Sequence, residues 1–277
     1  MYLSDLDGDV EAAVTLNRRT FIGAATGALL AGRVQAREEE KLEEDNIVEL
    51  RQYTLRGGQR DTLIALFEKC FIEPQNALGA HVIGTFRDLD DPDRFVWIRG
   101  FRDFGTRPEA LAAFYSGPVW QANRIAANAT MLDSDNVLLL HPSVPGRGLS
   151  AAPSVHTLAG DIIGATIHYL GPVTTAQFAL FFEQSMLPRL KESGAQPIAS
   201  FVTEESANNF PRLPVREHDR AFIWFARWAS VSEEESSAAR VAAWTGWRDS
   251  APEAVFPALM RKPERLRLAP TDRSALR

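Results

Sequence analysis

The sequence carries the same order of strands and helices twice. One copy begins near Ile47 and the other near Ile162. Their strand segments are VELRQYTL, HVIGTFRD and FVWIRGF in the first copy, and IIGATIHYL, PIASFVTE and FIWFARW in the second. Because a repeat with a constant spacing is typical of a duplicated unit, the repetition constrains the fold more than any single motif does.

The spacing between matching residues shows where the copies differ. Tyr53 matches His168 at an offset of 115 residues, whereas Trp97 matches Trp224 at an offset of 127. The difference of 12 residues indicates an insertion within the segment ESANNFPRLPVREHDR of the second copy. We therefore expect one unit that recurs with a single longer loop.

Each copy predicts a ferredoxin-like βαββαβ unit, so the fold class is α+β. Large aromatic residues share one face of each predicted sheet, and leaving them exposed would cost roughly 1.5–3 kcal/mol each in lost burial. We expect the two repeats to pack sheet to sheet as an α/β barrel with these residues inside: Phe95, Trp97, Phe101, Phe222, Trp224 and Trp228.

The predicted boundaries follow from these patterns. The first repeat spans 46–142 and the second 161–268, with a linker at 143–160 that is rich in Pro, Gly and Ser. Residues 269–277 are expected to be a frayed tail.

Composition excludes several classes of protein. The net charge of −6 and the lack of a basic stretch argue against a nucleic-acid partner. The five histidines show no metal-ligand spacing and there is one cysteine, so we predict neither a metal site nor a cofactor. Dinucleotide, P-loop and serine-hydrolase motifs do not occur either.

The first 36 residues resemble a twin-arginine signal peptide. Arg18 and Arg19 precede Phe21, a mildly apolar stretch follows, and Ala36 ends a short run of small residues where a signal peptidase would cleave. We expect the translocase as a partner, a periplasmic or extracellular location, and no stable membrane anchor after cleavage.

The residues on either side of the twin-arginine segment bear on where translation starts and where the linker lies. Residues 1–16 are acidic, which is unusual ahead of such a motif, so translation starting at Val14 is an alternative to Met1. Residues 37–45 read as an acidic linker.

Several strings resemble the NIPSNAP family: VELRQYTL, FIEPQNALG, FRDLDDPDRFVWIRGF, AFYSGPVW and NNFPRLPVRE. The resemblance covers roughly residues 46–268 and is strongest in the first copy. It implies a dimeric α/β-barrel fold built here from tandem domains within one chain. It implies no general reaction or catalytic set.

Polar residues on the aromatic face of the sheets are the candidate site residues. For catalysis we single out His168 as a general base, with Tyr53 beside it. For ligand binding we expect the lumen of the barrel to present Glu49, Arg51, Arg99, Trp97, Phe101, Trp224 and Trp228. The alternative is that Glu49 pairs with Arg51 or Arg99 and that His168 is a hydrogen-bonded wall residue.

The leading hypothesis is an exported barrel protein that binds a small apolar or aromatic acid in its lumen, as a monomer with an internal barrel or as a homodimer. Whether it is an enzyme is left open. One alternative is a cofactor-independent monooxygenase or isomerase-like enzyme, and another is a non-catalytic interaction module with a packed core.

The export hypothesis predicts that replacing Arg18 and Arg19 together by Lys retains the precursor in the cytoplasm. The translocase would read guanidinium groups, which Lys does not reproduce. Cell fractionation and immunoblotting measure the result, and an unchanged periplasmic yield would contradict the twin-arginine assignment.

Overall fold

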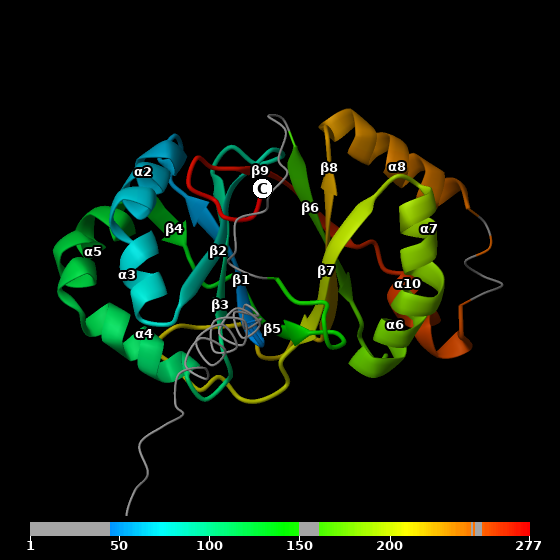
Figure 1. Ribbon diagram of the computed structural model, residues 1–277, viewed down its shortest axis with the longest axis horizontal. Helices are drawn as coiled ribbons and strands as arrows, with labels where there is room; N and C mark the ends of the chain where they lie inside the picture. Colours follow the sequence, from blue (N-terminus) through cyan, green and yellow to red (C-terminus); the bar gives the residue numbers. More distant parts are fainter. Residues whose placement is uncertain (1–44, 150–160, 245, 247–250) are drawn as a thin grey trace, which may run out of the picture. The chain divides into compact units, whose positions relative to one another are not determined.

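Two halves with the same order of main elements make up the described chain (Figure 1). The computed structural model describes residues 45–149, 161–244, 246 and 251–277, so the predicted signal peptide lies outside the described residues. The first half (residues 45–149) contains β1 (Ile47–Leu55), α2 (Arg60–Cys70), α3 (Ile72–Ala77), β2 (His81–Asp88), β3 (Arg94–Phe101), α4 (Arg107–Ser116), α5 (Pro118–Thr130), β4 (Met131–Asp133) and β5 (Val137–Pro142).

The second half (residues 161–277) repeats the order of the main elements without a counterpart of β4. It contains β6 (Ile162–Tyr169), α6 (Thr175–Phe181), a π-helical turn at Phe182–Met186, α7 (Leu187–Glu192), β7 (Gln196–Thr203), β8 (Ala221–Trp228), α8 (Val231–Ala243), a 3₁₀ turn at Glu253–Val255, α10 (Phe256–Leu259) and β9 (Glu264–Pro270).

Matching glycines end the first helical segment of each half. Gly79 and Gly194 adopt φ of 81° and 91°, a conformation that other residues rarely adopt. In both, the next residue donates its N–H back into the helix, from Ala80 to the Gln75 carbonyl and from Ala195 to the Leu190 carbonyl, each at 3.0 Å. This is the Schellman arrangement, and it occurs at positions 115 residues apart.

The two four-stranded sheets join into a closed antiparallel barrel. Around the barrel the strands follow the order β1, β3, β2, β9, β6, β8, β7 and β5, and β5 pairs with β1 again. The fourth strand of each half pairs with the second strand of the other, because β5 meets β7 and β9 meets β2. The predicted α/β barrel of two ferredoxin-like units is confirmed.

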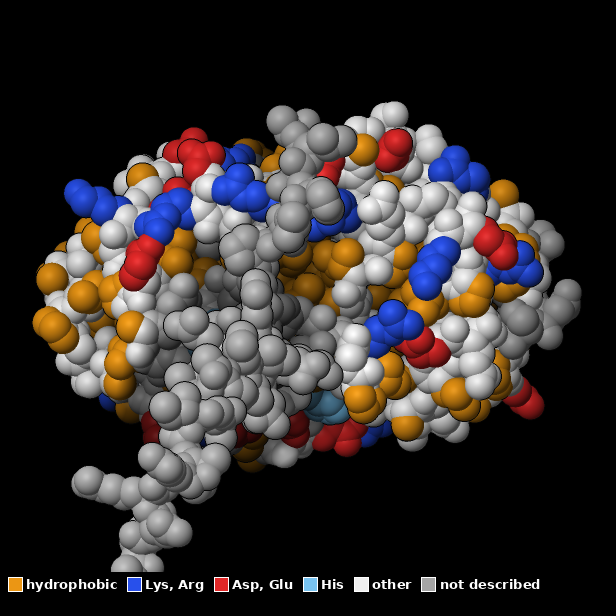
Figure 2. All heavy atoms as spheres, viewed as in Figure 1, with side chains coloured by type: hydrophobic (Ala, Val, Ile, Leu, Met, Phe, Trp, Pro, Cys, Tyr) orange, Lys and Arg blue, Asp and Glu red, His pale blue; other side chains and the backbone are white. Residues whose placement is uncertain are grey.

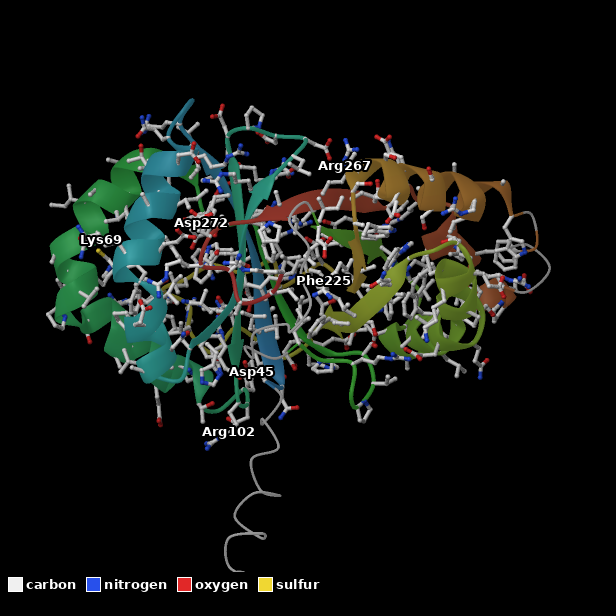
Figure 3. All side chains as sticks on the ribbon, turned by 45° about the horizontal axis from the view of Figure 1, so that its top comes forward. Asp45, Lys69, Arg102, Phe225, Arg267 and Asp272 are labelled. Atoms are coloured by element: carbon white, nitrogen blue, oxygen red, sulfur yellow. The ribbon has the colours of Figure 1, made fainter. Side chains whose placement is uncertain are left out.

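The prediction that the large aromatic residues face the barrel interior was wrong. Aliphatic residues from all eight strands fill the interior, together with three aromatic residues, Phe86, Phe201 and Phe225. Figure 3 shows Phe225 between the two sheets and Lys69 on the outer helical layer. The remaining interior strand residues are Val48, Leu50, Ile83, Val96, Ile98, Leu138, Leu140, Ile163, Ala165, Ile167, Ala199, Ala221, Ile223, Leu266 and Leu268.

The large aromatic residues lie instead between each sheet and its helices. Trp97 and Phe95 pack against α2 and its neighbours in the first half, and Trp224 and Trp228 pack beneath α6, α7 and α10 in the second. An eight-stranded barrel is only just wide enough for its own side chains, so small branched residues suit its interior. Bulkier rings lie in the layer beneath the helices, where they pack against helix side chains.

The insertion predicted in the second half reaches across to the first half. Asn209 donates to the Phe104 carbonyl at 2.5 Å, and Phe210 packs against Phe101, Leu139 and Tyr115. The segment therefore covers one end of the helix–sheet layer of the first half.

The C-terminal tail is ordered rather than frayed. Thr271 bonds Thr85 through both hydroxyls at 2.6 Å, and the Leu276 N–H donates to the Ile83 carbonyl at 2.8 Å. Leu276 joins the interior cluster, so the tail closes one side of the barrel beyond β9.

The described surface mixes residue types. On the face seen in Figure 2, acidic, basic and apolar side chains are interspersed. Within the part of the chain that the structure describes, no helix is long and apolar enough to cross a membrane.

Candidate functional site

The helix–sheet layers of the two halves are equivalent in backbone but not in side chains. Glu49 lies opposite Arg99 in the β1–β3 ladder, and Gly164 lies opposite Ala226 at the same place in the β6–β8 ladder. The first half therefore carries two charges where the second half carries almost no side chain. This difference decides which of the two layers has room for a pocket.

In the first half, Glu49 is the centre of a buried ionic cluster with three arginines. Its Oε2 accepts from Arg51 Nη1 at 2.6 Å and from Arg99 Nε at 2.9 Å, and its Oε1 accepts from Arg107 Nε at 2.7 Å. All four side chains are buried. Burial alone would raise the pKa of Glu49, but Arg99, Arg51 and Arg107 together hold it well below its usual range.

Neutral oxygens accept further guanidinium hydrogens, while Arg99 Nη2 and Arg107 Nη2 make no hydrogen bond within the described residues. Arg51 Nε donates to Tyr53 Oη at 3.0 Å, and Arg99 Nη1 donates to Gln75 Oε1 at 3.0 Å. Arg107 Nη1 donates to the side chains of Asn208 and Asn209, both in the insertion of the second half. The cluster thus ties the first sheet to its helices and to the long loop of the other half.

Little space is left in this layer. A cavity of about 30 Å³ lies between the first sheet and its helices. It is lined by Tyr53, Leu63, Phe67, Phe71, Gln75, Trp97, Phe114, Tyr115, Trp120, Ala127 and Met131.

The second half holds a pocket of about 380 Å³ at the corresponding place. This volume lies in the range of small-molecule sites. Its walls come from β6, β8, α7, α8 and the α10 region: Thr166, His168, Met186, Leu190, Trp224, Trp228, Ser237, Ala238, Val241, Ala242, Phe256, Leu259, Met260, Arg261, Pro263 and Arg265.

The pocket is open because its residues are smaller than their counterparts in the first half. Besides Glu49 and Arg99, the side chains of Arg51, Leu111 and Tyr115 are absent from the second half. Thr166, Ala238 and Ala242 stand in the corresponding positions, at offsets of 115 and 127 residues. Trp228 lies directly over Gly164, where any β-carbon would collide with its ring.

His168 is the titratable group buried in this pocket. Trp224 Nε1 donates to His168 Nε2 over a long 3.4 Å, so the neutral ring carries its proton on Nδ1. That Nδ1 is buried and has no partner among the described residues. Burial lowers the pKa of His168 to about 4, so the ring is neutral at physiological pH.

Basic groups stand at the edge of the pocket. Arg265 forms an ion pair with Glu234, so its charge is compensated. Arg261 is exposed and lies against Gly171, with 3.3 Å between its guanidinium carbon and the position of a β-carbon there. Within the described ranges its guanidinium has no hydrogen-bond or ion-pair partner, which leaves it available to an anion.

The structure does not bring the predicted site residues together in one lumen. Tyr53 and His168 occupy equivalent positions in opposite halves, with the filled barrel interior between them, so the predicted catalytic pair shares no site. Glu49, Arg51, Arg99, Trp97 and Phe101 belong to the first layer. His168, Trp224 and Trp228 belong to the second layer.

Sequence reasoning missed two arginines. Arg107 begins α4 and Arg261 follows α10, and neither lies on a strand whose alternation would mark it. The signal available in the sequence was the offset of 127 residues, which matches Arg107 with Glu234. The two halves therefore carry opposite charges at this equivalent position. In the described ranges no group of three His, Cys, Asp or Glu side chains is placed to hold a metal ion.

Comparisons with known proteins agree with this architecture. Residues 48–143 match the NIPSNAP family, so the first half carries a NIPSNAP domain. A proposed monooxygenase from Fusobacterium nucleatum has the same fold with a TM-score of 0.52 at 7% identity, covering 82% of this chain and 93% of that one. No curated protein matches the chain significantly.

Two further solved structures are less similar in shape. A proposed monooxygenase from Lactobacillus acidophilus is 15% identical over 82% of this chain and 94% of that one, with a TM-score of 0.49. A NIPSNAP-like domain protein from Burkholderia xenovorans is 25% identical over 38% of this chain and 92% of its own, with a TM-score of 0.35.

The ionic cluster predicts a large structural effect of Glu49→Gln. Removing the carboxylate leaves three buried guanidinium groups without their anion, and breaking a buried ion pair costs about 3–5 kcal/mol. Chemical denaturation should show this loss. Glu205→Gln, which breaks an exposed pair with Arg220, should cost less than about 1 kcal/mol. Equal losses in the two variants would contradict a cluster that stabilises the fold.

The burial of His168 predicts a pH-dependent stability. Its pKa of about 4 in the folded protein lies below the unfolded value, so its contribution is fully present above about pH 6.5 and falls as pH drops toward 4. Between pH 6.5 and 5 this loss is about 2 kcal/mol. Urea unfolding of His168→Gln should show a correspondingly shallower decline than the wild type, whereas parallel curves would contradict the buried neutral state.

Proposed function

We propose that the chain binds a small apolar or aromatic acid in the second-half pocket, the 380 Å³ space defined above. The observation that carries this proposal is the combination of an apolar pocket, a buried neutral histidine and an uncompensated arginine at its edge. The pocket replaces the barrel lumen as the predicted binding place.

The chemistry of the walls favours this class of ligand. Trp224 and Trp228 offer indole surfaces, and Met186, Leu190 and Leu259 add flexible or branched apolar contacts. A planar ring gains from both burial and edge or face contacts with such indoles. Arg261 supplies the charge-assisted hydrogen bonds that a carboxylate accepts. The charged end of the ligand would thus stay near the opening while its apolar body is buried.

A cofactor-independent monooxygenase or isomerase-like reaction is the second candidate, and His168 favours it. The unprotonated Nε2 of the neutral imidazole can accept a proton from an acidic C–H or O–H group of a bound substrate once it is released from its long contact with Trp224 Nε1. The low pKa of His168 makes it a weak base, so the substrate proton would have to be correspondingly acidic. The similar solved structures share only their fold with this chain, so they do not support a particular reaction.

The filled interior, whose side chains form one hydrophobic cluster, favours the interaction-module alternative for the barrel itself. Export through the twin-arginine pathway stays part of the proposal. Descent of both halves from one duplicated domain is inferred from the equal offsets and the equivalent ladders.

The binding proposal predicts that Ala238→Phe abolishes ligand binding. The larger ring occupies the space that Leu111 holds in the first half, so the pocket closes. The probe is 1-anilinonaphthalene-8-sulfonate, an aromatic anion, and the measurement is its fluorescence on titration. Ala239→Phe, an exposed neighbour on the same helix outside the pocket, should bind as the wild type does.

Displacement of the probe by a competing ligand distinguishes specific binding in the pocket from non-specific adsorption to the protein surface. Small aromatic carboxylates should displace the probe from wild-type protein, and Arg261→Gln should weaken both ligands about tenfold through the lost ionic contact, worth about 1.4 kcal/mol. Equal probe binding by wild type and Ala238→Phe would refute the pocket.

Oxygen consumption with a bound phenolic acid, lost in His168→Phe, would favour the enzymatic candidate.

A further inference from the structure

The ionic cluster of the first half carries more positive than negative charge. Arg51, Arg99 and Arg107 surround one carboxylate, Glu49, and all four side chains are at most 2% exposed. The formal charge of the cluster is therefore +2. The acceptors around it, described above, are neutral amide and phenol oxygens. Buried charges are usually compensated by a counter-charge, because removing an ion from water is costly.

A small cavity borders the side chains that hold these arginines. Its lining includes Tyr53, which accepts from Arg51, and Gln75 and Tyr115, which accept from Arg99 at 3.0 and 3.5 Å. Trp97 also lines it, and the guanidinium carbons of Arg51 and Arg99 lie 5.5 and 5.1 Å from its ring. The cavity thus lies beside the uncompensated charge.

Hydrogen-bond donors at this cavity outnumber free acceptors. Trp97 is 2% exposed and its Nε1 has no partner among the described residues. The Tyr53 and Tyr115 hydroxyls accept from arginines, so their own protons are available to donate. Gln75 uses its amide nitrogen on the Phe71 carbonyl at 3.1 Å. A guest that only accepts hydrogen bonds satisfies this arrangement.

We propose that the cavity is a binding site for one halide ion, chloride under ordinary conditions. Its small volume of about 30 Å³ suits a monatomic ion better than a carboxylate with its carbon skeleton. The neighbouring positive charge excludes a cation. A water molecule fits by size, but it would bring two hydrogens of its own and no compensating charge.

The site is distinct from the proposed ligand pocket. At the corresponding positions of the second half, Thr166, Leu190 and Ala226 replace Arg51, Gln75 and Arg99. That layer therefore lacks the excess charge, although His168 Nδ1 and Trp228 Nε1 are buried donors without partners among the described residues there as well. The halide would make the first half a charge-compensated structural layer, while the second half stays open to organic ligands.

Bromide provides the direct test, because it replaces chloride and scatters anomalously. Crystals of the protein grown with bromide in place of chloride should show an anomalous difference peak in the cavity, within about 3.5 Å of Trp97 Nε1. Electron density for a water molecule without an anomalous peak, or an empty cavity, would overturn the proposal.

Thermal unfolding provides a second test in solution. At constant ionic strength, replacing gluconate by chloride should raise the Tm by a few degrees, because chloride would bind only the folded state. Trp97→Phe keeps the ring but removes the N–H donor and should lose most of this chloride dependence. Trp244→Phe, in the other half and outside the cavity, should retain it.

Two results of the thermal unfolding experiment would contradict the halide proposal. A wild-type Tm that is the same in chloride and gluconate would show that no halide is bound. A chloride effect that is equal in wild type, Trp97→Phe and Tyr115→Phe would place the ion elsewhere and overturn the assignment to this cavity.

Discussion

Closure of the eight-stranded barrel is the constraint on which the rest of the structure depends. The interior of such a barrel admits only compact side chains, and here the aliphatic faces of both sheets fill it. The buried charges Glu49 and Arg99 and the indoles of Trp97, Trp224 and Trp228 are consequently placed between a sheet and its helices. The functional chemistry therefore lies in two separate outer layers rather than in a shared central space.

The two outer layers have equivalent backbones, but their side chains differ in size and charge. In the first half, Glu49 and three arginines fill the layer and bind it to the insertion of the second half through Asn208 and Asn209. In the second half the matching positions are small, and the pocket opens around His168. The first layer is thus filled by an ionic cluster, and the second contains a pocket.

Much of the fold was predictable from the sequence. The constant offsets between Tyr53 and His168 and between Trp97 and Trp224 located both units and the insertion, and the pairing of strands follows them. The choice of interior face was not predictable, because both faces of these strands are buried. Alternation separates two faces, but it does not say which one meets the other sheet.

The candidate site was only partly predictable, for related reasons. His168, Trp224 and Trp228 were recognised, yet the pocket they line exists because Ala238 and Ala242 lack bulk, and small residues give no signal of a cavity. The pairing of Tyr53 with His168 was wrong for a reason already present in the sequence. Equivalent residues of two repeats are related by the pseudo-symmetry of the barrel, which puts them on opposite sides.

The central claim is that the second-half pocket holds a small organic acid, and native mass spectrometry of protein purified from its own host tests it most directly. The account predicts one retained molecule per chain, with the mass of an aromatic or apolar acid, released on acid denaturation and absent from Ala238→Phe prepared in the same way. A wild-type chain that carries no organic ligand, and gains none when incubated with aromatic acids, would contradict it.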